Sequence, residues 1–169
     1  MQKIIALYTS FDGRLRRRNF WLGVLGILVF SVVVSALLML AGFGETISGT
    51  GTVQIDGGQS GQYSFSETTL NSWASLAITL ITAIPSMAIA VKRRHDRDNS
   101  GLDAKLIIGL IILLQILQSA GVVFVGYVMV GANLILGIAA IYLLVVTGFL
   151  KGDSHPNGYG PDPLESPNR

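Results

Sequence analysis

Long uncharged runs separated by short polar segments are the main pattern of this chain. Residues 20–43 and 70–91 contain 24 and 22 residues without a charge, and residues 106–150 contain 45. A helix rises about 1.5 Å per residue, so roughly 20 apolar residues cross a hydrocarbon core about 30 Å thick. We therefore predict transmembrane helices over about 20–43 and 70–91. Because 45 residues exceed one crossing, we predict two more over about 106–124 and 128–150, with a turn near 121–126.

The positions of the basic residues predict the orientation of these four helices. All 12 Lys and Arg residues lie before the first run, between the second and third, or after the fourth. The loop 44–69 carries Glu45, Asp56 and Glu67 and no basic residue. By the positive-inside rule, both termini and the loop 92–105 are cytoplasmic and the loop 44–69 is extracytoplasmic. We expect one four-helix domain over residues 1–151, followed by a cytoplasmic tail, 152–169, whose prolines and glycines argue against a helix.

Two of the flanking segments carry weaker periodic patterns. Apolar residues from Ile4 to Phe11 occur near helical spacing, which predicts either a short interfacial helix or an irregular lead-in to the first span. Residues 52–55 and 62–65 alternate apolar and polar positions around a glycine-rich segment. This pattern predicts either a hairpin pairing Val53 with Phe65 and Ile55 with Tyr63, or a flexible loop. Since an isolated hairpin is marginal in water, its apolar face should rest on the helices or on another copy.

Composition supports the membrane interpretation and excludes several protein classes. Hydrophobic residues make up 50% of the chain, charged residues only 13%, and the mean hydropathy is +0.57. An ordinary soluble domain has about twice as many charged residues, and a disordered chain far fewer apolar ones. The absence of cysteine excludes disulfides, thiolate metal sites and a cysteine-linked lipid anchor. The fold class expected is an all-α integral membrane protein.

Two polar stretches next to the predicted spans contain the candidate site. The first, residues 11–21, contains the arginines Arg14 and Arg17 and the candidate interfacial anchors Phe11, Phe20 and Trp21. The second, residues 92–101, contains Arg93, Arg94, His95, Asp96 and Asp98. Guanidinium groups and carboxylates at one membrane face are partly desolvated and pair selectively. We expect Asp96 and Asp98 to accept hydrogen bonds from Arg14 or Arg17, while surplus arginines bind anionic lipid phosphates. The alternative is that basic residues such as Arg16, Arg18, Lys92 and Lys105 serve only to set topology.

In these two stretches the chain resembles the bacterial family of small inner-membrane proteins designated DUF 805, a domain of unknown function. The first motif of that family is matched by Phe11, Gly13, Arg14, Arg17, Phe20 and Trp21. The second is matched by Arg93, Arg94, His95, Asp96, Ser100 and Gly101, and the third by Asn157, Tyr159, Gly160 and Pro163. Two features depart from the family pattern: the arginine pair directly precedes His95, and Leu102 stands where a tryptophan is usual. The resemblance implies a bacterial inner-membrane location and no assigned activity.

Three functional hypotheses follow, and none requires a cofactor, a metal or nucleic acid. The first is a non-enzymatic module that binds anionic lipids or a protein partner, plausibly as a homo-oligomer given the small residues on its helices. The second is an oligomeric channel or small-solute transporter lined by Gln115, Gln118 and Asn133, although these amides also suit helix–helix hydrogen bonds. The third is an enzyme acting on lipid headgroups through His95 and Asp96. A metal site drawn from His95, Asp96, Asp98, Asp153 and His155 is an unspecific further alternative.

Overall fold

The computed structural model describes residues 2–55, 59–122 and 126–164, and four of its helices are long and apolar enough to cross a membrane. The first consists of α2 (Arg17–Leu38) and the π-helical turn η1 (Met39–Phe43), and the second is α3 (Ser72–His95). The third is α4 (Leu102–Ser119), and the fourth consists of α5 (Gly126–Leu144) with the π-helical turn η2 (Val145–Phe149). A short helix, α1 (Gln2–Thr9), precedes them. The protein is thus a mostly helical, multi-pass membrane protein, and part of the predicted turn at 121–126 lies outside the described residues.

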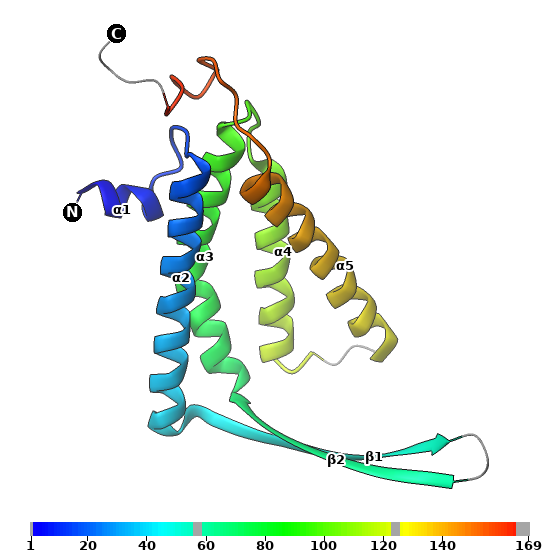
Figure 1. Ribbon diagram of the computed structural model, residues 1–169. Coiled ribbons are helices and arrows are strands. Elements are labelled where there is room, and N and C mark those ends of the chain that lie inside the picture. Colours follow the sequence, from blue (N-terminus) through cyan, green and yellow to red (C-terminus); the bar gives the residue numbers. More distant parts are fainter. Residues whose placement is uncertain (1, 56–58, 123–125, 165–169) are drawn as a thin grey trace.

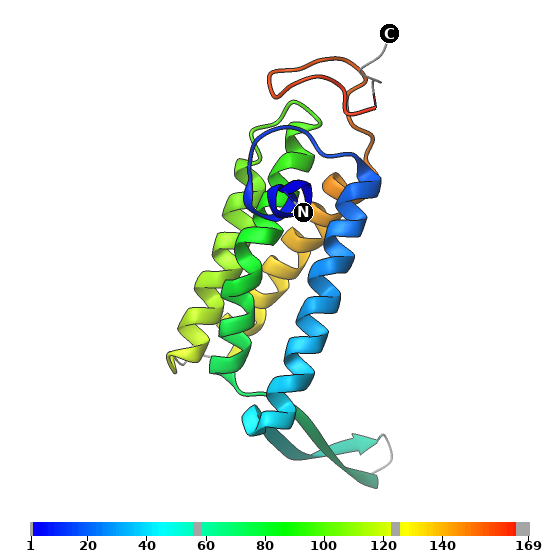
Figure 2. The ribbon, with the colours of Figure 1, turned by 90° about the vertical axis from the view of Figure 1, so that its left-hand side faces the viewer.

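The helices form a bundle with two different ends (Figure 1). Helix α3 packs against both α2 and α4, which lie on its opposite sides (Figure 2). Helix α1, the loop between α3 and α4, and the tail lie together at one end, which we call the tail end. The strands lie at the other, the hairpin end. Both buried apolar clusters, one around Phe20 and Ile89 and one around Val91 and Ala104, lie in the tail-end half.

The hairpin is present, longer than predicted and in a different register. Strands β1 (Gly44–Ile55) and β2 (Gln59–Leu70) pair antiparallel over 12 residues each, so each is about 40 Å long. Phe65 and Tyr63 lie opposite Gly49 and Gly51, not opposite Val53 and Ile55. The aromatic rings cover these glycines, since a Cβ on Gly49 would meet the Phe65 ring at 2.6 Å. The predicted register was therefore wrong, because it ignored the cross-strand space that glycine gives to an aromatic ring.

Within the part of the chain that the structure describes, the apolar face of the hairpin does not rest on the helices. The strands run across the ends of the helices rather than along them (Figure 1). Because alternate residues share a face, Ile47, Val53, Tyr63 and Phe65 lie on one side of the sheet, and each is about half exposed. Contact with a second copy stays a prediction.

The boundary between α3 and α4 differs most from the sequence prediction. Residues 92–95, assigned to a loop, continue α3, and residues 102–105 begin α4, so the connection is reduced to residues 96–101. It closes tightly because Gly101 has a left-handed φ of 68°, and a Cβ there would lie 3.1 Å from the Val91 backbone. Four consecutive basic residues, Lys92 to His95, are thereby placed in the buried last turn of a helix.

Candidate functional site

The tail end of the bundle holds a group of buried polar side chains that we call the polar cluster: Arg14, Lys92, Arg93, Arg94, His95 and Asp96. Four of them come from the last turn of α3, Asp96 follows directly as the C-cap of that helix, and Arg14 comes from the segment that leads into α2. That segment is held against α3 by a backbone hydrogen bond from Leu15 N to Lys92 O, 3.2 Å long. Burial of so many charges requires partners for each of them, and the structure supplies these.

Asp96 is the anionic centre of the polar cluster. Its Oδ1 accepts a hydrogen bond from Arg14 Nε at 3.1 Å, and its Oδ2 accepts one from Arg93 Nη1. The side chains of Arg14 and Arg93 are 1% and 0% exposed, and that of Asp96 is 7% exposed. Burial raises the pKa of Asp96, while the charge of Arg93 and the hydrogen bond from Arg14 act in the opposite direction. The carboxylate therefore depends on both arginines to remain charged.

Basic side chains also cap the carbonyl end of the fourth span. Arg93 donates from Nε to Thr147 O at 2.8 Å and from Nη2 to Leu150 O. Donors from α2 and from the loop after α3 reach the neighbouring carbonyls: Trp21 Nε1 to Gly148 O at 3.1 Å, Arg17 Nη1 to Phe149 O at 3.2 Å, and Arg97 Nη1 to Val146 O at 3.5 Å. Carbonyls in the last turn of a helix lack intrahelical donors and carry partial negative charge. Five consecutive carbonyls thus join the fourth span to α2, α3 and the loop that follows α3.

Lys92 performs the same task for α1. Its Nζ donates to Ala6 O at 2.8 Å and to Leu7 O at 2.6 Å, both in the last part of that helix. The side chain is buried, so Lys92 does more than set topology. It fixes α1 across α3, and this position could not be predicted from a charge count.

Arg94 joins α3, α4 and α5 through a carboxylate. Its Nε and Nη2 bind Asp103 at 3.1 and 2.9 Å, a two-point contact of the kind guanidinium groups favour. The hydroxyl of Tyr142 donates to Oδ2 of the same carboxylate at 3.0 Å, the oxygen that Arg94 Nη2 also contacts. Neither Asp103 nor Tyr142 was predicted as a site residue. The signal available was an acidic residue in the first turn of α4, where it also favours the helix N-terminus.

The tail folds back over the polar cluster. Arg14 donates to three tail carbonyls: Asp153 O at 2.5 Å, His155 O at 2.7 Å and Gly160 O at 3.3 Å. Asn157 Nδ2 donates to His95 O at 2.9 Å, and the Tyr159 ring stacks on the His95 imidazole with centroids 3.8 Å apart.

Close packing at Gly152 brings the tail against Asp96. A Cβ on Gly152 would lie 1.8 Å from Asp96 Oδ2. The three sequence motifs are therefore brought into contact at one end of the bundle.

The chain belongs to the DUF805 family of proteins of unknown function. The family's sequence pattern matches residues 8–161, which is nearly the whole chain. No curated protein and no solved structure matches it. The structure explains why the three DUF805 motifs occur together, because each motif supplies hydrogen-bond or packing partners to the other two.

The other residues predicted for the site have a variety of partners. Asp98 is exposed, and its Oδ1 accepts a bond from Gly158 N at 3.2 Å rather than from an arginine. Phe20 is only 4% exposed, so it packs in the core, as Phe11 does in part. Trp21 is 39% exposed and bonds to Gly148 O, a position that suits an interfacial anchor.

The imidazole of His95 makes a stacking contact through its face and a hydrogen bond through one nitrogen. Besides stacking on Tyr159, its ring bonds through Nδ1 to Gly13 O at 3.2 Å. Within residues 2–55, 59–122 and 126–164, no three His, Cys, Asp or Glu side chains come together as a metal site would require. The contacts of His95 therefore favour a structural role for this residue in the DUF805 fold over an acid–base role.

The intramembrane amides lie near the hairpin end. Gln118 Nε2 lies 3.3 Å from Met129 Sδ on α5, and Asn133 Nδ2 donates to Met129 O, 2.9 Å away within its own helix. Gln115 is half-buried on α4. The contact of Gln118 joins two helices, which is the packing role expected for an amide in a span.

Proposed function

We propose that this DUF805 protein lies in the bacterial inner membrane with its tail end in the cytoplasm and acts as a non-enzymatic module that binds anionic phospholipid. The supporting observation is a division among the arginines. Arg14, Arg93 and Arg94 direct their guanidinium groups to protein oxygens, as described above. Arg16, Arg17 and Arg18, at the start of α2, are exposed at the level where the first span begins, and Arg17 also donates to Phe149 O.

Electrostatics near a bilayer gives this division its significance. A basic side chain near an anionic lipid surface contributes about 1 kcal/mol of attraction, which falls off within a Debye length of about 8–10 Å. Three adjacent exposed arginines would therefore supply roughly 3 kcal/mol at low ionic strength. The same positive charge supports the proposed orientation, because the basic residues of this chain flank the tail ends of the spans.

The test compares lipid retention by variants of the exposed arginines. The double variant Arg16→Gln/Arg18→Gln leaves Arg17, which bonds to Phe149 O, in place. Loss of two charges should reduce the preference for phosphatidylglycerol over phosphatidylcholine by roughly 30-fold, measured by native mass spectrometry of protein released from nanodiscs. Arg16→Lys/Arg18→Lys is the matched control, since it keeps both charges and should keep the preference. An unchanged preference in the Gln variant would show that these arginines do not select lipid.

Self-association of the protein is a separate proposal. The spans expose large apolar residues along most of their length, and small residues such as those of the Ser31 to Ser35 pair let helices approach closely. Native mass spectrometry of the protein released from nanodiscs measures how many copies associate. A mass of one chain would indicate a monomer, and a single larger multiple would indicate a closed oligomer.

A further inference from the structure

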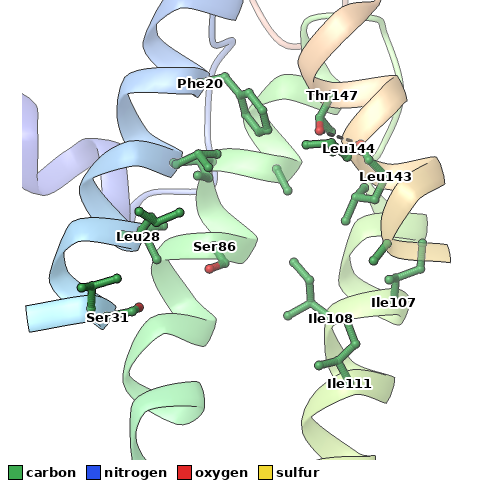
Figure 3. A pocket seen from close by; sticks show the side chains of 16 residues that line it. Phe20, Leu28, Ser31, Ser86, Ile107, Ile108, Ile111, Leu143, Leu144 and Thr147 are labelled. Atoms are coloured by element: carbon green, nitrogen blue, oxygen red, sulfur yellow. Dashed lines mark hydrogen bonds between the residues drawn. The ribbon is translucent and has the colours of Figure 1, made fainter. Parts of the chain in front are cut away.

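An apolar groove lies between the four spans in the tail-end half of the bundle (Figure 3). Its volume is about 490 Å³, within the range of ligand pockets. The lining contains no charged side chain, and its three hydroxyls belong to Ser31, Ser86 and Thr147. Leu28 and Val32 line its α2 edge and are 55% and 60% exposed, so the groove opens to the surface beside α2. Within a membrane, that side faces hydrocarbon rather than water.

The groove is closed at its tail end by hydrogen bonds between α2 and η2. At the tail end, α2 and η2 are joined by the Trp21–Gly148 and Arg17–Phe149 hydrogen bonds. From there α5 diverges from α2 toward the hairpin end (Figure 1). Phe20 and Thr147 are the lining residues nearest the tail end, and they precede Trp21 and Gly148 in the chain. The groove is thus a wedge that ends one helical turn below the exposed arginines.

The depth of the groove equals about one leaflet of a bilayer. Its lining on α2 runs from Phe20 to Val32, twelve residues further along, which is about 18 Å of helix. Half of a hydrocarbon core about 30 Å thick is about 15 Å. On α3 the lining is confined to residues 86–90, close to the end at His95, and on α4 to residues 107–111, close to its start. All four walls therefore lie in the same leaflet.

We propose that this groove holds one acyl chain of a phospholipid of the cytoplasmic leaflet, whose phosphate lies at Arg16 to Arg18. This inference rests on the orientation and headgroup contact proposed above, and it adds a binding site for the hydrocarbon part of the lipid. A helix of a second copy fits the space poorly, since a helix is about 10 Å wide and the groove narrows to the Trp21–Gly148 and Arg17–Phe149 bonds that join α2 to η2. A flexible, unbranched chain fits a narrow apolar wedge and leaves its charged headgroup beside the arginines.

The test uses phosphatidylglycerol that carries a photoreactive diazirine midway along one acyl chain, with the full-length protein in nanodiscs. Labelling should concentrate on lining residues such as Val24 and Leu143. Ala140→Phe places a ring in the groove, and Ser31→Phe does so from the opposite wall. If either ring excludes two methylene groups of the acyl chain from the groove, labelling of the lining should decrease about tenfold. Ala36→Phe is the matched control, because Ala36 is exposed on α2 outside the groove.

The outcomes separate this proposal from the headgroup proposal. Labelling spread over outward-facing residues such as Val29 and Ile138, or labelling of the lining that neither groove variant reduces, overturns the acyl-chain site. Cross-links between two copies through the lining would assign the groove to a second chain and also overturn it. A photoreactive phosphatidylcholine is the second arm. If it labels the lining as strongly, and Arg16→Gln/Arg18→Gln changes nothing, the acyl-chain site stands and the anionic preference fails. If the lining stays unlabelled while phosphatidylglycerol retention depends on the arginines, the anionic preference stands and the acyl-chain site fails.

Discussion

Replacement of Asp96 by Asn tests whether the polar cluster holds the tail end together. The substitution keeps the shape of the side chain and removes its charge. Asn retains one acceptor oxygen and turns an NH2 donor toward the other guanidinium group, so one of the bonds to Arg14 and Arg93 becomes donor against donor. Both arginine side chains are at most 1% exposed, so water cannot replace the lost partner.

The expected loss of stability is that of a buried ion pair from which the carboxylate is removed while the arginines remain. Removal of one partner of such a pair typically costs about 3–5 kcal/mol. For a domain of this length the midpoint of thermal unfolding shifts about 2–4 °C per kcal/mol, so we expect a decrease of roughly 10 °C in detergent micelles. The assay is thermal unfolding followed by circular dichroism at a fixed scan rate.

Asp98→Asn is the matched control for this measurement. It makes the same chemical change two residues away, at an exposed carboxylate with a single 3.2 Å bond from Gly158 N. Loss of such a bond costs about 1 kcal/mol or less. If the two variants unfold within a few degrees of each other, Asp96 is not the centre of a stabilising network and the reasoning is refuted.

Three further predictions test other parts of the structure. Gly152→Ala should release the tail, because its Cβ would meet a carboxylate oxygen at 1.8 Å. Limited proteolysis should therefore cut the tail faster than in the control Gly158→Ala, whose Cβ has an ordinary 3.5 Å contact, and equal cleavage would contradict the docking of the tail. Lys92→Gln should increase hydrogen exchange in α1 by about tenfold or more, since loss of one charged hydrogen bond costs about 1.5–3 kcal/mol, with little change in α5; unchanged exchange in α1 would show that this lysine does not hold the helix. Single cysteines at Gln59 and Asn99 should react with an impermeant thiol reagent from opposite sides of the membrane, and labelling of both from one side would overturn the four-span topology.

Local sequence determined the elements of this fold. Uncharged runs of 22 residues or more must either be buried within the protein or face the hydrocarbon of a membrane, and the four spans follow from that requirement alone. Alternation in the loop 44–69 indicated strands, and the helical spacing from Ile4 to Phe11 indicated α1. The family motifs were also visible, because they combine Arg, His, Asp and Gly where topology needs only positive charge.

The tertiary structure decided which basic residues are buried, how the strands register and where the groove lies. Lys92 and Arg93 resemble Arg16 and Arg18 in sequence, yet the first two meet free carbonyls of α1 and η2 while the others remain exposed. Helix-end carbonyls are present in every helix, so a sequence cannot tell which side chain reaches them. The same holds for the space between α2 and α5, which exists because two helices joined at one end diverge toward the other. Each of these features depends on contacts between residues far apart in the chain, and such contacts leave no periodic signal in any one segment.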